Sequence, residues 1–175
     1  MHAILQLLKG GDRRSIGKSD EVVALVLGEP ALFDVLFSGI LEDDPLVRMR
    51  SADALEKVTA VHPEFLVPHK RALLGSLALV EQPGVRWHVA AMLARLPLTE
   101  REQMTVVNIL TGYMNDRSSI VKTMAMQSLY DLAERYTALR PIARLHIGEL
   151  AVSGTAAMKA RGRKLLATLN RDAAT

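Results

Sequence analysis

The feature that most constrains this chain is one helix-start pattern that recurs along it. Val-Arg, followed at fixed spacing by Ala and Leu, begins at Val47 and begins again at Val85, 38 residues later. Less regular copies begin at Val121 and Met158, after further steps of 36 and 37 residues. A near-constant period in the range of about 20–50 residues is typical of solenoids, in which each repeat is one supersecondary unit stacked on the next. The pattern therefore predicts a stack of helical repeats.

The first copy carries the signals of a helix start. Asp44 can accept hydrogen bonds from the N–H groups of a first helical turn, and Pro45 suits the first helical position, where no N–H is needed. We expect a helix over 45–60. Farther along, Thr99 and Glu102 stand three residues apart and predict a capping box at the start of another helix.

The first copy resembles a HEAT repeat of the short HEAT-like type found in relatives of phycobilisome lyases. The residues that carry the resemblance are Asp43, Asp44, Pro45, Leu46, Val47, Arg48, Ala52, Ala54 and Leu55. In that family each repeat is a pair of antiparallel helices, A and B, and this motif marks the start of B. The acidic residue that usually stands five positions before the motif is matched by Glu42 and Asp116. The resemblance implies an all-α, right-handed α-α superhelix of about five antiparallel helix pairs, and it says little about function.

We expect a single repeat domain over residues 1–175. A degenerate capping pair would occupy 1–28, because the outer face of a terminal repeat meets water. Four repeats would follow, at about 29–61, 62–97, 98–136 and 137–175. Pro68 falls inside an expected helix at 63–80 and is predicted to kink it.

Composition narrows the class of protein. Hydrophobic residues make up 49% of the chain and aromatic residues 4%, which favours packed helices, since strands are enriched in aromatic and β-branched residues. The absence of cysteine excludes disulfides, thiol catalysis and zinc sites with Cys ligands. The apolar run at residues 3–8 has no basic leader and is too short to span a bilayer. We expect a cytoplasmic protein without membrane contact.

Charge is unevenly distributed along the sequence. Residues 1–60 carry seven Lys or Arg and ten Asp or Glu, whereas residues 136–175 carry seven and two. An acidic front and a basic rear predict a partner of the opposite polarity, or end-to-end stacking of copies of this chain into a homo-oligomer.

The cations that follow the repeated apolar residue allow two interpretations. They are Arg48, Arg86, Lys122 and Lys159. In the first interpretation, each cation pairs with an acidic residue of the turn or with a neighbouring repeat and so holds the stack together. In the second, the cations form a ridge that faces a ligand. The first is favoured, because the family resemblance implies it and such pairs satisfy helix ends.

The residues just beyond these cations differ between the copies, which indicates a surface. Trp87 is the only tryptophan, and it stands between Arg86 and His88. Trp and Arg are common anchors of interfaces, although Trp87 can instead fill a gap between repeats. We therefore predict a partner-binding surface at the start of the B helices. Its candidate residues are Arg50, Trp87, His88, Met124 and Arg161, with Arg48, Arg86 and Lys122 beneath or beside them.

The sequence contains no catalytic constellation. The five histidines form no i, i+4 pair, and neither a Gly-rich phosphate loop nor a Gly-x-Ser-x-Gly elbow occurs. We expect no enzyme activity, no cofactor and no metal. The basic run of Lys159, Arg161, Arg163 and Lys164 is either a solvated outer face or a contact for an acidic partner or phosphates.

These observations favour a non-enzymatic scaffold for protein–protein interaction, which uses the concave face of stacked helix pairs. The alternative is a nucleic-acid-binding protein or a HEAT-like protein that repairs alkylated bases. Repair proteins of that kind use several tryptophans, whereas this chain has one. The resemblance alone also implies a third function, a chaperone of a pigment protein similar to chromophore lyases.

Overall fold

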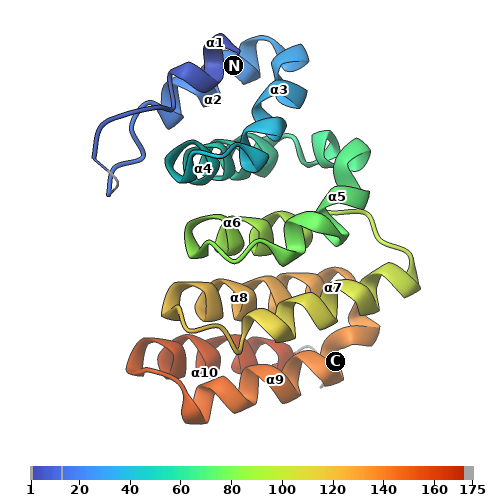
Figure 1. Ribbon diagram of the computed structural model, residues 1–175. Coiled ribbons are helices and arrows are strands. Elements are labelled where there is room, and N and C mark those ends of the chain that lie inside the picture. Colours follow the sequence, from blue (N-terminus) through green and yellow to red (C-terminus); the bar gives the residue numbers. More distant parts are fainter. Residues whose placement is uncertain (1, 13, 172–175) are drawn as a thin grey trace. The chain divides into compact units, whose positions relative to one another are not determined.

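The computed structural model describes residues 2–12 and 14–171, and within these ranges the chain is all helical, without a β-strand (Figure 1). The α-helices are α1 (Ala3–Gln6), α2 (Ser19–Gly28), α3 (Phe33–Ser38), α4 (Pro45–Val61), α5 (Lys70–Leu74), α6 (Pro83–Leu93), α7 (Glu100–Tyr113), α8 (Ser119–Arg135), α9 (Arg140–Ser153) and α10 (Ala156–Arg171). Short 3₁₀ helices lie between them, namely η1 (Pro30–Leu32), η2 (Gly39–Leu41), η3 (Pro63–His69), η4 (Ser76–Leu79) and η5 (Thr137–Leu139). The expected all-α class is confirmed.

The chain divides into two compact units, Met1–Met92 and Leu93–Thr175. The first unit runs from α1 into α6, and the second holds α7 to α10. The expected single repeat domain and its internal boundaries remain predictions.

The first unit is built around α4. Helices α2 and α3 pack against α4, and α1 packs against α3 (Figure 1). Helix α4 begins where the sequence predicts it, because Asp44 Oδ1 accepts the N–H of Leu46 at 2.8 Å and Pro45 takes the first helical position. The N-cap and the helix predicted over 45–60 are therefore confirmed.

The segment that follows α4 is broken into short pieces. The sequence predicts one kinked helix over 63–80, but the structure has η3, α5 and η4 there. Pro68 lies inside η3, and Gly75, with φ −117° and ψ −105°, separates α5 from η4. Proline removes a backbone donor and clashes with the preceding turn, so the chain adopts tighter 3₁₀ turns in place of a continuous helix. The helix is therefore interrupted more strongly than the predicted kink implies.

The second unit consists of helical hairpins. Short turns join α7 to α8 and α9 to α10, and α8 packs against α7, α9 and α10 (Figure 1). The predicted capping box opens α7, because Thr99 Oγ1 accepts the N–H of Glu102 at 3.3 Å and Glu102 Oε2 accepts the N–H of Thr99 at 2.8 Å. Gly162 allows α10 to approach α9, since an added Cβ would lie 2.8 Å from Ala151 Cβ.

The recurring apolar positions are buried in both units. Those with 0% exposure are Val47, Leu55, Val85, Leu93, Val121 and Leu129. Met158 and Leu165 of the fourth copy are 2% and 7% exposed. Full burial of such a side chain stabilises a protein by roughly 1.5–3 kcal/mol. The pattern that recurs in the sequence therefore marks the residues that hold each unit together.

Candidate functional site

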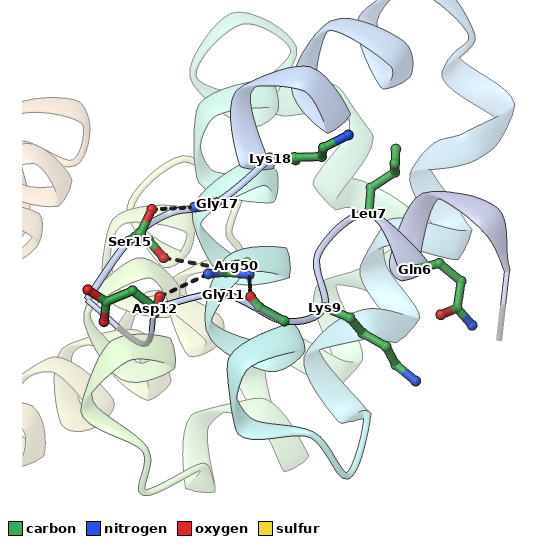
Figure 2. A pocket seen from close by; sticks show the side chains of 10 residues that line it. Gln6, Leu7, Lys9, Gly11, Asp12, Ser15, Gly17, Lys18 and Arg50 are labelled. Carbon is green, nitrogen blue, oxygen red and sulfur yellow. Dashed lines mark hydrogen bonds between the residues drawn. The ribbon is translucent and has the colours of Figure 1, made fainter.

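Arg50, one of the predicted partner-binding residues, is a buried charged side chain of the first unit. It is 2% exposed. Its Nε donates to the carbonyl of Ser15 at 3.1 Å, and Nη2 donates to the carbonyl of Asp12 at 3.0 Å (Figure 2). Nη1 donates to the carbonyls of Leu8 and Gly10 at 2.8 and 2.7 Å. The loop between α1 and α2 is thus wrapped around one guanidinium. Arg50 leaves almost no surface for a partner.

Glycines let this loop turn its carbonyls inward. Gly10, Gly11 and Gly17 have φ values of +70°, +77° and +57°, a region that other residues rarely adopt. At Gly17 an added Cβ would also lie 2.6 Å from Arg50 Cζ. The loop is therefore a cradle for a cation, with carbonyls rather than amides pointing to its centre.

Farther along α4, toward its C-terminus, polar side chains link this helix to α2. Ser19 Oγ lies 2.6 Å from Asp53 Oδ2, and Lys57 Nζ lies 2.8 Å from Asp53 Oδ2 and 2.6 Å from Asp20 Oδ1. Burial opposes the charge on Lys57, but the hydrogen bonds to Asp20 and Asp53 outweigh it, so the pKa of Lys57 is raised above 10.5. Two helices distant in the sequence are held together by this arrangement.

His88, another predicted partner-binding residue, lies in the interior. It is 2% exposed, and its Nε2 is 3.9 Å from Asp53 Oδ1 of α4. Arg50 and His88 occupy equivalent positions of the first two copies, and each lies against a segment from earlier in the chain: the loop between α1 and α2 for Arg50, and α4 for His88. Burial at this position removes both residues from the accessible surface.

Arg48 and Arg86 make equivalent hydrogen bonds. Arg48 Nη1 donates to the carbonyl of Glu42 at 2.8 Å, and Arg86 Nε donates to the carbonyl of Val80 at 2.9 Å. In both cases the acceptor stands six residues before the arginine. These bonds connect each arginine to the turn that precedes its helix through backbone carbonyls, whereas the first interpretation names an acidic residue of the turn or a neighbouring repeat as the partner.

Gln82 links the two copies directly, a role that the sequence did not signal. Its Oε1 accepts from Arg48 Nε at 2.9 Å, and its Nε2 donates to the carbonyl of Pro45 at 2.7 Å. The start of α6 is therefore fastened to the start of α4. A lone glutamine before a helix carries no pattern that would have identified it.

The remaining candidates are more accessible and lie in separate units. Trp87, in the first unit, is half-buried, as are Lys122 and Met124 in the second. Arg161 is exposed on α10. Within the described residues, the side chains of Lys122 and Arg161 make no hydrogen bond and no ion pair.

Two hollows lie on either side of the Gly10–Gly11 bend. One, of about 370 Å³, is lined by residues 6 and 7 at the end of α1, by residues 9–12, 15, 17 and 18 of the loop that follows, and by Arg50 (Figure 2). The other, of about 350 Å³, is lined by the same two glycines, the first turn of α4 with Met49, and Gln82. Sequence reasoning missed both hollows, although three glycines within eight residues were a signal for an unusual loop.

All three phenylalanines of the chain gather in one cluster of the first unit. The ring of Phe33 lies 5.3 Å from Phe65 and 6.4 Å from Phe37, and His69 stacks on Phe37 at 3.9 Å. Asp34 Oδ1 is 2.9 Å from His69 Nε2. The cluster packs α3 against η3 and is a structural feature.

Residues 2–12 and 14–171 contain no group of three potential metal ligands. None of the helices described here is long and apolar enough to cross a membrane. Comparisons of the chain with protein-family models, with curated proteins and with solved structures find no match.

Proposed function

We propose that this chain is a non-enzymatic, cytoplasmic scaffold for protein–protein interaction, built as a HEAT-like right-handed stack of helix pairs. The observation that carries the proposal concerns two side chains, Met49 and Trp87. They occupy equivalent positions of the first two copies, and both are half-buried on α4 and α6. Such a stack offers an extended concave surface without needing a reactive group.

Three features support the repeat architecture. The recurring apolar positions are buried, Arg48 and Arg86 bind the carbonyl six residues upstream, and Gln82 joins the starts of α4 and α6. Repeated packing and repeated hydrogen bonds at one period are what stacked repeats require.

The proposed partner surface is the start of α4 and α6. Gly84 lies so close to Met49 that an added Cβ would be 2.8 Å from Met49 Cγ, so the two helix starts adjoin. Met49 also lines the 350 Å³ hollow together with Pro45 and Leu46. Trp, Met and Arg are enriched in the cores of interfaces. Trp87 and Met49 therefore form the centre of the proposed surface.

Replacing Trp87 by alanine tests this surface. We expect Trp87→Ala to weaken binding of a protein captured from cell extract by ~2 kcal/mol or more, about 30-fold, because an anchor tryptophan is lost. The affinity is measured by calorimetry with the identified partner. The control is Leu79→Ala on η4, a side chain that is 77% exposed in the same unit and outside the surface. Equal affinities of the wild-type protein and Trp87→Ala would contradict the proposal.

A nucleic-acid-binding function is the second candidate, and α10 is the observation that favours it. This helix exposes Arg161, Arg163, Lys164 and Arg171 and contains no acidic residue. A protein that makes about 6–10 phosphate contacts loses roughly 10³–10⁵ in affinity between about 50 and 200 mM salt. Capture with and without nuclease separates the candidates, since loss of every partner after nuclease treatment would replace the scaffold by this function.

A further inference from the structure

Another hollow, of about 400 Å³, lies between α7 and α9 of the second unit (Figure 1). Asn108 and Thr111 line it from successive turns of α7, and Asn115 lines it from the segment directly after that helix. His146 and Glu149 line it from α9, where a separation of three residues places both side chains on one face. The hollow is therefore bordered by polar side chains from both helices.

Most of the hydrogen-bond donors of these side chains are already used. Thr111 Oγ1 donates to the carbonyl of Asn108 at 3.1 Å, and Asn115 Nδ2 donates to the carbonyl of Thr111 at 3.1 Å. His146 Nδ1 lies 3.0 Å from Glu149 Oε2, and because a carboxylate only accepts, Nδ1 carries the proton of this bond. The amide oxygen of Asn115 and Nε2 of the neutral His146 ring remain as acceptors, without a donor among the described residues.

The hollow combines a negative charge with apolar surface. Among the described residues that line it, Glu149 is the one acidic side chain, and none is a lysine or an arginine. Glu149 is 63% exposed, so a ligand can reach its carboxylate from solvent. Met114 and Leu150, which are 6% and 9% exposed, add apolar surface. Gly112 leaves space beside them, since nothing lies within 4 Å of the position that its Cβ would take.

We propose that this hollow binds the ammonium group of a primary alkylamine. An ammonium has three N–H donors, no acceptor and one positive charge, which match the Glu149 carboxylate and the free acceptors of Asn115 and His146. The alkyl chain would lie against Met114 and Leu150. Ligand sites span about 300–1,000 Å³, so a hollow of about 400 Å³ fits a small amine or the end of a lysine side chain.

Titration of the isotope-labelled full chain with butylammonium tests the site. We expect saturable shifts of the side-chain amide signals of Asn108 and Asn115, and no shift of the corresponding signal of Asn170 on α10. Butyltrimethylammonium has the same charge but no N–H donor, and butanol has a hydroxyl but no charge. Both should bind at least about tenfold more weakly, because each lacks one of the two properties that the hollow selects.

The amide of Nα-acetyl-lysine distinguishes the two sources of the ammonium group. Affinity equal to or above that of butylammonium would identify a lysine side chain of a polypeptide as the ligand, whereas weaker binding would identify a free amine. Equal affinity for butylammonium and butyltrimethylammonium, or a response to butylammonium that stays linear, would overturn the site.

Two variants test the charge and the space separately. Glu149→Gln keeps the size of the side chain but removes its charge, and should weaken butylammonium binding at least about tenfold. Gly112→Leu fills the hollow and should weaken binding to a similar extent. Gly148→Leu is the matched control, because Gly148 lies in α9 without lining the hollow and also has nothing within 4 Å of its Cβ position.

The thermal midpoint of each variant, followed by circular dichroism, shows whether the fold is retained. Gly148→Leu should bind butylammonium as the wild-type protein does. Wild-type affinity of Glu149→Gln, or an equal loss of affinity in the two glycine variants, would overturn the site. None of these measurements involves Trp87, which belongs to the first unit, so this proposal and the proposed scaffold function fail separately.

Discussion

At the scale of single residues, the loop between α1 and α2 depends on what glycine alone permits. Gly17 combines a φ of +57° with an approach to Arg50 that leaves no room for a Cβ. At position 17, a residue with a side chain would strain the backbone and would displace the guanidinium from the carbonyls of Leu8 and Gly10. The hydrogen bonds between Arg50 and the loop therefore depend on glycine at position 17.

The first prediction at this scale is a pair of glycine substitutions with opposite signs. Gly17→Ala should lower the free energy of unfolding by about 1–2 kcal/mol or more, from the left-handed conformation and the contact with Arg50. Gly148→Ala should raise it by about 0.5–1 kcal/mol, because Gly148 is inside α9 and nothing lies within 4 Å of its Cβ position. Chemical denaturation measures both. A neutral Gly17→Ala would show that the loop does not hold Arg50 as described.

At the scale of elements, polar side chains decide how α2, α4 and α6 meet. Lys57 bridges Asp53 of α4 and Asp20 of α2, and Gln82 fastens the start of α6 to Arg48. Both links join residues more than thirty positions apart in the chain. The first unit is therefore held by specific hydrogen bonds in addition to its apolar core.

The link through Lys57 predicts a pH dependence. Its pKa is raised in the folded protein, because the hydrogen bonds to Asp20 and Asp53 outweigh the opposing effect of burial. A raised pKa means that the contribution to stability is fully present below the unfolded value of 10.5 and is lost as pH rises through the folded value.

The measurement is the difference in free energy of unfolding between the wild-type protein and Lys57→Gln. We expect this difference to be constant from about pH 6 to 9 and to shrink above about pH 10.5. Lys164→Gln, which removes an exposed lysine of α10, serves as the control and should show no such change. A difference that persists at the highest pH would refute the role assigned to Lys57.

At the scale of the whole chain, helix length and burial are uneven. Helices α4 and α8 each run for 17 residues, whereas η3 and η4 have 7 and 4. Hydrogen bonds of 3₁₀ turns have poorer geometry than those of an α-helix. Local opening should therefore be easier in the short pieces than in the long helices.

Hydrogen exchange tests this expectation within the first unit. The amides between Val47 and Val58 of α4 should exchange more slowly than those of η3 and η4, because α4 is enclosed by α2 and α3. Peptide-resolved exchange at one pH and temperature measures the rates. Similar protection of α4 and η3 would indicate that the unit opens only as a whole.

The sequence alone determined the features that depend on neighbouring residues. The N-cap at Asp44, the capping box at Thr99 and the apolar period were predictable, because each is a local interaction or a burial pattern that every copy repeats. Pro68 was recognised as a disruption, but its effect was underestimated, since nearby packing decides whether a chain kinks or adopts 3₁₀ turns.

Only the tertiary structure decided which candidate site residues are accessible. Arg50, His88, Met124 and Arg161 share one position of the repeat, yet the first two are buried, the third is half-buried and the fourth is exposed. The solvent exposure of each side chain depends on what packs against it. A glycine-rich loop covers Arg50, and His88 lies near Asp53 of α4. Those contacts join residues far apart in the chain, so no local pattern specifies them.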